Sequence, residues 1–359
     1  MTTPNYAERW EALGRGETIP TPDVSNALKT AERKHYNPLA HAADDFIHWA
    51  QNPNERIYLG FPDIDNEMRG IAPSEMCLIN GYSHSGKTMF LLQILLANND
   101  KPVVYFCPDE PRTLTLIKLT CLMYGIQADM LEAKVANNDP DAIKLLRDTA
   151  NESFPNLAVF DQMMTLNEME QALGEIKDMW GKPSLLVFDY LELLNGGGED
   201  VPSKANTLKA FGKRHNIPLL VLHQSSRTAG ADGKKMTISS GAYGGEQQAT
   251  HILGVRRKKF EIESQIRDIE ERLETSRNTE RLLERLDALR YELRIHQDTV
   301  TINLVKCKRP ASRLLDDIDF EIEHGTGRLT RLPTGHFPDN MPSVAQTDEQ
   351  LSILDDDWI

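Results

Sequence analysis

Residues 81–88 read Gly81-Tyr82-Ser83-His84-Ser85-Gly86-Lys87-Thr88, which is a complete G-x-x-x-x-G-K-[ST] phosphate-binding loop. Its two glycines let the backbone turn so that successive N–H groups face the phosphates of a nucleoside triphosphate. The lysine reaches the β- and γ-phosphates, and the threonine hydroxyl can ligate Mg²⁺. The loop therefore predicts a nucleotide site formed by Gly81, Ser83, Ser85, Gly86, Lys87 and Thr88.

The segments around this loop predict the fold. An apolar run at 75–80 precedes the loop and a helical apolar run at 89–96 follows it, so the phosphates would lie at a helix N-terminus, where the helix dipole favours anions. Helices and strands then alternate, as in a doubly wound α/β fold with a mostly parallel central sheet. Near-continuous apolar runs, typical of strands buried on both faces, occur at 75–80, 102–107, 156–160, 184–188 and 218–222. Further strands at 250–255, 299–306 and 317–322 extend this sheet or pair at its edge.

An insertion at 256–297 separates two of the later strands. Apolar residues recur at 4-3-4 spacing in both of its halves, which predicts an antiparallel helical hairpin with one apolar seam along each arm. The two series are Ile262, Ile266, Ile269 and Leu273, then Leu282, Leu286, Leu289 and Leu293. A structural spacer and a contact arm for DNA or a partner protein are both compatible with this pattern.

The two ends of the chain differ from the central part. Residues 1–55 form an arm with a short amphipathic helix at 41–50, and this helix is too short to be stable alone. Its apolar face therefore needs a groove, either on its own domain or on a neighbouring subunit. Residues 336–359 predict a disordered acidic tail, which would serve solubility, bind a partner or mimic nucleic acid. The central 56–335 would be the catalytic domain.

Bulk properties limit the function classes. The chain of 359 residues has a net charge of −14, which argues against coating nucleic acid over the whole surface but leaves room for a local basic channel. None of the four cysteines has C-x-x-C spacing, so reduced thiols are expected and a zinc site is not. Neither a signal peptide nor a long uncharged apolar run is present, which predicts a cytoplasmic protein without a membrane span.

Acidic residues at strand ends supply further chemistry. Asp189 ends the apolar strand 184–188, where a phosphate-loop enzyme needs an acid to hold Mg²⁺ or its water shell. In phosphate-loop ATPases of the RecA type, which this arrangement resembles, the catalytic glutamate follows the strand after the phosphate-loop helix. Glu110 fits that place better than Asp109 and would orient the attacking water, and Glu192 is the competing base.

Polar and basic residues follow the remaining strands. Gln224, after the strand 218–222, is placed to sense the γ-phosphate and to move the segment that follows it. Two glycine-containing loops on that side can hold a nucleic-acid backbone, or are ordinary surface loops. They are residues 227–245, with Arg227, Lys234 and Lys235, and residues 195–205, with Lys204.

Together these segments resemble the RecA-like motor domain of the replicative hexameric helicases of the bacterial DnaB type and their phage relatives. The resemblance covers about 56–330 and is carried, besides the phosphate loop, by the segments Gly60–Asp65, Phe106–Pro111, Phe188–Leu193, His223–Arg227, Gly245–Ala249 and Val305–Pro310.

In that family a Lys-x-Arg pair on the last of these segments reaches the γ-phosphate of a neighbouring subunit. Lys306 and Lys308 occupy this spacing here, and Arg309 lies one position later. We expect Arg309 to be the finger, because a planar guanidinium suits transition-state charge, although Lys308 keeps the family register.

Two departures define the type of family member. Residues 1–40 are too short for the helical collar domain of the bacterial enzymes, and the hairpin at 256–297 replaces a short connection. The chain therefore resembles a compact, phage-like member without the N-terminal collar, acting in the cytoplasm, or in the host cytoplasm if phage-encoded. Its helix at 41–50 resembles the linker helix that docks on the next subunit.

The resemblance implies an ATP- and Mg²⁺-dependent 5′→3′ DNA helicase that forms a ring, expected to be hexameric, on single-stranded or forked DNA. A primase, a loader or a single-strand-binding protein would be its partners. The alternative is a RecA- or RadA-like recombination ATPase forming filaments on single strands. A third hypothesis is a scaffold or loader in which ATP switches partner binding.

Overall fold

The computed structural model describes residues 39–194, 200–224, 245–275 and 279–333. The chain divides into two compact units, Met1–Glu55 and Arg56–Ile359. In the first unit the described part is the helix α3 (Leu39–Gln51) and a single 3₁₀ turn at Pro53–Glu55. Phe46 and Ile47 of α3 are exposed. The predicted arm before this helix and the predicted acidic tail lie outside the described residues.

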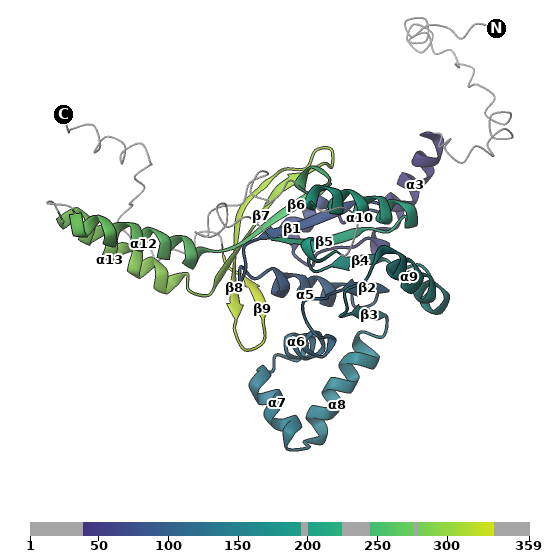
Figure 1. Ribbon diagram of the computed structural model, residues 1–359, viewed down its shortest axis with the longest axis horizontal. Helices are drawn as coiled ribbons and strands as arrows, with labels where there is room; N and C mark the ends of the chain where they lie inside the picture. Colours follow the sequence, from purple (N-terminus) through teal and green to yellow (C-terminus); the bar gives the residue numbers. More distant parts are fainter. Residues whose placement is uncertain (1–38, 195–199, 225–244, 276–278, 334–359) are drawn as a thin grey trace, which may run out of the picture. The chain divides into compact units, whose positions relative to one another are not determined.

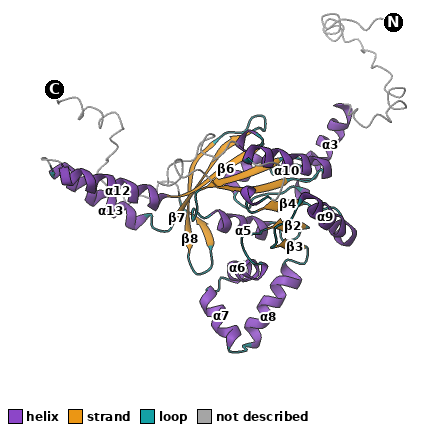
Figure 2. Cartoon of the chain, in the orientation of Figure 1, coloured by secondary structure: helices purple, strands orange, loops and turns teal. Residues whose placement is uncertain are grey.

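A nine-stranded mixed sheet organises the second unit, and its strands run in the order β3-β2-β4-β5-β1-β6-β7-β8-β9 (Figures 1 and 2). Their bounds are β1 Met76–Gly81, β2 Val103–Phe106, β3 Leu157–Phe160, β4 Leu185–Phe188, β5 Leu219–Gln224, β6 His251–Arg257, β7 Thr299–Cys307, β8 Leu315–Glu323 and β9 Arg328–Arg331. Neighbouring strands from β3 to β6 pair in parallel, and those from β6 to β9 pair antiparallel. The predicted α/β fold with a mostly parallel central sheet is confirmed.

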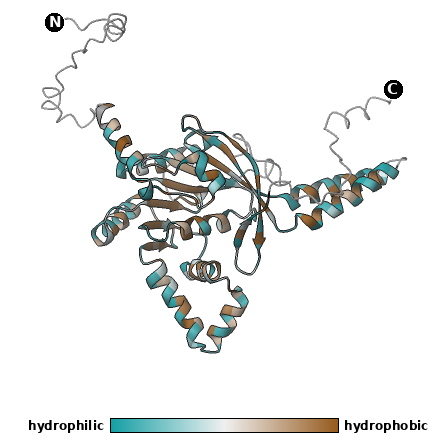
Figure 3. Cartoon of the chain, turned by 180° about the vertical axis from the view of Figure 1, so that it is seen from behind, coloured by the Kyte–Doolittle hydropathy of each residue, from teal (hydrophilic) through white to brown (hydrophobic). Residues whose placement is uncertain are grey.

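Helices cover both faces of this sheet. One core contains side chains of α4 (Pro62–Met68), α5 (Lys87–Ala97) and α6 (Arg112–Tyr124), and the other contains side chains of α9 (Leu166–Trp180) and α10 (Val201–His215). Figure 3 shows the strands between them as hydrophobic, as expected for strands buried on both faces. The helices α7 (Ala128–Ala136) and α8 (Pro140–Asp148) pack on α6 through a smaller apolar cluster.

The predicted helical hairpin is also confirmed. It consists of α12 (Lys258–Thr275) and α13 (Glu280–Ile295), and it is inserted between the paired strands β6 and β7 (Figure 1). Ile262, Ile269, Leu286 and Leu289 are buried between the two arms, and the other four predicted seam residues pack against them. Both apolar stripes face each other, so the hairpin has a small core of its own.

Among the helices that the structure describes, none is long and apolar enough to cross a membrane by itself, and the bent pair α6–α7 passes that test only by length and composition.

Candidate functional site: a nucleotide-binding cavity

The phosphate-binding loop connects β1 to α5, and its two glycines are required by its surroundings. Gly86 is the N-cap of α5 and has a positive φ of 99°, which side-chain-bearing residues rarely adopt. A Cβ atom on Gly81 would lie 2.4 Å from the carbonyl oxygen of Val255 on β6. The ammonium of Lys87 donates to the carbonyls of Gly81 and Tyr82, at 2.8 Å each. The loop thus holds this cation at the start of α5, where it is placed for a phosphate.

A cavity of about 650 Å³ opens beside this loop, which is within the usual size range of small-molecule sites. Its wall contains most of the predicted site residues: Ser83, Ser85, Gly86, Lys87, Thr88, Glu110, Asp189 and Gln224. Gly81 lies behind the wall, at the end of β1. Residues far apart in the sequence therefore meet at the carboxyl ends of neighbouring parallel strands, where ligands bind in open α/β sheets.

Asp189 follows β4 and is 6% exposed. The hydroxyl of Tyr105 on β2 donates a hydrogen bond of 2.9 Å to its Oδ2 atom. Burial raises the pKa of Asp189 to about 6, the hydrogen bond from Tyr105 opposes this rise, and the negative charge of Glu110 adds to it. Tyr105 was missed in the sequence. The available signal was a phenol within an otherwise apolar strand, because a buried tyrosine hydroxyl usually finds a polar partner.

The oxygen ligands in the cavity fit a magnesium ion. Thr88 and Asp189 line the same cavity and offer one hydroxyl and one carboxylate. Mg²⁺ is commonly held by one or two carboxylates together with substrate phosphates and water, rather than by a cage of protein ligands. Consistent with this, the described part of the chain contains no group of three or more His, Cys, Asp or Glu side chains able to hold a metal ion.

Two neighbouring acids follow β2. Both carboxylate oxygens of Glu110 lie 2.6 Å from Nζ of Lys118 on α6, and this ion pair is partly buried. Asp109 lies at the same cavity and is exposed. Lys118 was not identified from the sequence, because nothing in its surroundings distinguishes it from other helix lysines. Glu110 is thus held by a cation of its own chain, whereas Asp109 is exposed to solvent.

The predicted nucleic-acid residues lie on or beyond the elements that end at this cavity. Gln224 ends β5 and is paired in register with Gly81 of the phosphate-binding loop. Arg227, Lys234 and Lys235 lie outside the described residues. Lys204 lies on α10 and is not part of the cavity wall.

The predicted trans-acting residues lie at the end of β7 and just after it. Nζ of Lys306 donates to the carbonyl of Glu246 at 2.9 Å, and burial together with the nearby charges of Lys308 and Lys209 lowers the pKa of Lys306. Lys308 is exposed. These like-charged ammonium groups create a region of positive potential at this end of the strand.

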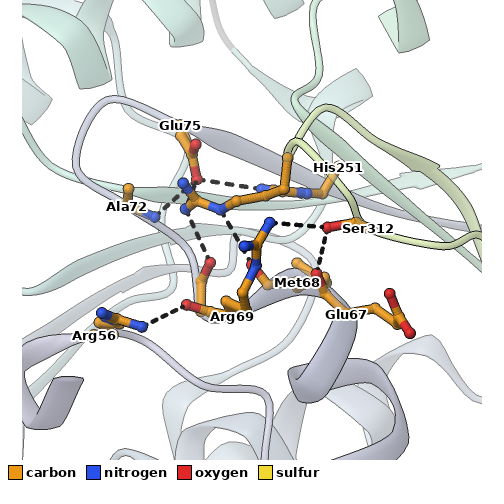
Figure 4. Close-up of polar contacts among 10 residues, drawn as sticks. Arg56, Glu67, Met68, Arg69, Ala72, Glu75, His251 and Ser312 are labelled. Atoms are coloured by element: carbon orange, nitrogen blue, oxygen red, sulfur yellow. Dashed lines mark hydrogen bonds and ion pairs between the residues drawn. The ribbon is translucent and has the colours of Figure 1, made fainter. Parts of the chain in front are cut away.

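Arg309 does not have the free geometry expected of a finger. Its guanidinium pairs with the carboxylate of Glu75 at 2.8 Å and also donates to the carbonyls of Met68 and Gly70. Figure 4 shows the contacts of this region, in which Glu75 also accepts hydrogen bonds from the backbone of Ala72 and from the imidazole of His251. The partly buried guanidinium is held by its own chain, so the geometry argues against Arg309 and favours Lys308.

The fold and the cavity define a phosphate-loop NTPase with a RecA-like core. Residues 57–284 match the family described as the DnaB-like helicase C terminal domain, which is more than half of the chain. The protein therefore belongs to the DnaB-like helicase C-terminal domain family, as its resemblance predicted.

Individual relatives agree with this assignment. The Replicative DNA helicase DnaB of Pasteurella multocida is 23% identical over 197 residues, which cover 51% of this chain and 42% of that protein. Its counterpart from Nostoc sp. is 25% identical over 226 residues, covering 56% and 25%, respectively. The chain thus spans less than half the length of these relatives.

Two solved structures share the fold. The first, an isolated ATPase domain, superposes with a TM-score of 0.62 at 15% identity, covering 83% of this chain and 100% of that domain. The second, a DnaB-like replicative helicase described together with its interactions with primase, has a TM-score of 0.59 at 15% identity and covers 90% and 71%.

Proposed function

We propose that this protein is an ATP-dependent 5′→3′ DNA helicase whose subunits form a ring, expected to be hexameric. The observation that carries the proposal is the single cavity in which Lys87, Thr88, Asp189, Glu110 and Gln224 meet within a core of the DnaB-like family. Direction and ring size follow from family membership alone. The role of a replicative helicase also implies a cytoplasmic location.

Each residue of the cavity has a separate task in the proposed hydrolysis. Lys87 neutralises the β- and γ-phosphates, while Thr88 and Asp189 would hold Mg²⁺. When bound, the metal ion neutralises the charge that develops on the phosphate oxygens. Glu110 orients the attacking water, and Tyr105 fixes the Asp189 carboxylate through its 2.9 Å hydrogen bond. Lys308 of a neighbouring subunit would complete the site in trans.

Coupling to DNA would pass through β5. Gln224 lies in register with Gly81 and leads directly into residues 225–244, so a change at the γ-phosphate can move that segment. We propose that Arg227, Lys234 and Lys235, with Lys204 on α10, contact the DNA backbone. A primase, a loader or a single-strand-binding protein is the partner class that this role requires. Primase is named in the description of one solved relative, and for this chain it remains a proposal.

The proposed function predicts that single-stranded DNA stimulates ATP hydrolysis and that a duplex with a 5′ single-stranded tail is unwound. The measurement is steady-state ATPase with and without single-stranded DNA, beside unwinding of 5′- and 3′-tailed forks. Lys87→Ala is the negative control. Stimulation without unwinding would support the recombination ATPase instead, and slow hydrolysis that DNA does not stimulate would support an ATP-dependent scaffold.

A pair of conservative variants separates the two candidate bases. Glu110→Gln should lower DNA-stimulated kcat by about 10²–10⁴-fold, the usual contribution of a general base, while nucleotide affinity changes little. Asp109→Asn is the matched control, one residue away at the same cavity, and should retain most of the activity. If Asp109→Asn loses more activity than Glu110→Gln, the base is Asp109 and the Glu110–Lys118 pair is structural.

A further inference from the structure

Three side chains form a row across β1, β6 and β7. Cys77 is paired in register with His251, and His251 is paired with Cys307 on the other side. Residues directly opposite each other on neighbouring strands point to the same face of a sheet, so His251 lies between the two thiols. No chemistry in the nucleotide cavity uses this row.

His251 is completely buried, and one of its ring nitrogens is held by a carboxylate. Its Nε2 atom lies 3.2 Å from Oε2 of Glu75, an oxygen that also accepts the guanidinium of Arg309 at 2.8 Å. The other ring nitrogen, Nδ1, is buried and has no nitrogen or oxygen partner within the described part of the chain. The group that interacts with the imidazole on this side is the thiol of Cys307.

The four cysteines of the chain differ in exposure and in charge. Cys77, Cys107 and Cys121 are buried, and burial raises the pKa of each thiol, to about 11 for Cys107. Cys307 is only partly buried, and its pKa lies below the ordinary value. Burial alone would raise that pKa, but hydrogen bonds from His251, Ser312 and the backbone of Arg309 outweigh it. Partly exposed thiols in positive surroundings are the reactive ones.

We propose that Cys307 is a modification site, at which a thiol oriented by His251 and Glu75 reacts with low-molecular-weight disulfides. The Cys307 thiolate attacks one sulfur of the disulfide, and a new S–S bond forms as the old one breaks. The second sulfur leaves as a thiolate, so the Cys307 sulfur is oxidised and half of the reagent is reduced. An excess of small thiol reverses the step. A metal site is a poorer interpretation of this row, because no metal-binding group of three or more such side chains exists among the described residues.

The modification would act on the proposed trans contact, and this consequence rests on the proposed helicase function. Cys307 lies between Lys306 and Lys308 at the end of β7, and successive side chains of a strand point to opposite faces. A mixed disulfide would therefore grow on the side of Glu75 and Arg309, the ion pair that anchors the end of the strand. Displacing that anchor would misplace Lys308.

The test uses the folded full chain and the aromatic disulfide 5,5′-dithiobis(2-nitrobenzoate) as the probe. We expect one fast thiol per chain, assigned to Cys307 by peptide mass spectrometry, with the other cysteines reacting only after unfolding. Cys307→Ser should remove the fast phase. His251→Asn should slow it by about 3–30-fold, because an ordinary thiol is only a few per cent ionised near pH 7. Glu75→Gln, which disturbs the same imidazole from outside the core, is the second variant should His251→Asn fail to fold.

Fast labelling of another cysteine, or a Cys307 rate that neither variant changes, would overturn the site. The consequence for hydrolysis is tested separately, by measuring DNA-stimulated ATPase before and after labelling and after reversal with a small thiol. Activity should fall and return in the unmodified sequence but stay constant in Cys307→Ser. Labelled protein with unchanged ATPase would overturn the coupling, while the helicase proposal is judged by the unmodified enzyme.

Discussion

Asp189→Asn should abolish ATP hydrolysis and, at neutral pH, make the ligand-free protein more stable than the unmodified chain. Burial raises the pKa of Asp189 from its ordinary value of 3.8 to about 6. A shift of about 2 pKa units corresponds to about 3 kcal/mol of cost for keeping this carboxylate ionised in the fold. The neutral amide avoids that cost and can still accept the hydrogen bond from Tyr105, so we expect a gain of about 1–3 kcal/mol in the free energy of unfolding.

The gain should depend on pH in a defined way. Because the folded pKa is raised, the folded chain binds the proton more tightly than the unfolded chain between about pH 4 and pH 6. The stability contributed by protonated Asp189 is therefore complete below about pH 4 and is lost as the pH rises through about 6. The asparagine variant should match the unmodified protein near pH 4 and exceed it above pH 6, as measured by denaturation without nucleotide or Mg²⁺.

Tyr105→Phe provides the control for this prediction. It removes the hydroxyl that donates to Asp189 and leaves the carboxylate, so stability at neutral pH should fall by about 1–3 kcal/mol. Its effect thus has the opposite sign to that of Asp189→Asn. If the asparagine variant is no more stable at pH 7.5 than at pH 5, relative to the unmodified chain, the raised pKa of Asp189 is wrong. The loss of hydrolysis, at least about a hundredfold, would still report the metal ligand.

The sequence predicted those parts of the molecule whose signal is local. Eight strands and the hairpin were identifiable because apolar runs and 4-3-4 seams depend only on neighbouring residues. The short strand β9 (Arg328–Arg331) was missed, because only one of its four residues is buried and it carries no apolar run. The phosphate loop and Asp189 were identifiable for a related reason, since each lies directly after a buried strand.

Contacts between distant residues were not predictable in this way. Tyr105 meets Asp189 across 84 positions, and Arg309 meets Glu75 across 234 positions, so neither pair leaves a pattern along the chain. The choice of Arg309 as the finger considered the chemistry of the guanidinium alone. It did not consider that an arginine next to a buried turn can be consumed by a carboxylate and by backbone carbonyls of its own chain.

The same ion pair permits a decisive test of the trans contact. Lys308→Ala should lower DNA-stimulated ATPase by about 10³-fold, the lower end of the usual contribution of a cationic finger, with little change in stability because Lys308 is exposed. Mixed rings of Lys308→Ala and Lys87→Ala subunits should regain part of the activity, because an intact site can be rebuilt across one boundary. No recovery in rings that assemble normally would contradict a role in trans.

Arg309→Gln should behave differently, because it leaves the partly buried carboxylate of Glu75 without its cation. Breaking such a pair from one side costs about 3–5 kcal/mol, so this variant should unfold at a lower temperature as well as lose activity. Adding Glu75→Gln removes the unpaired charge and keeps amide donors for the carbonyls of Met68 and Gly70. The double variant should therefore regain both stability and ATPase if Arg309 only anchors the strand that presents Lys308. If stability returns while hydrolysis stays about 10³-fold low, the guanidinium itself reaches the neighbouring phosphate and Arg309 is the finger.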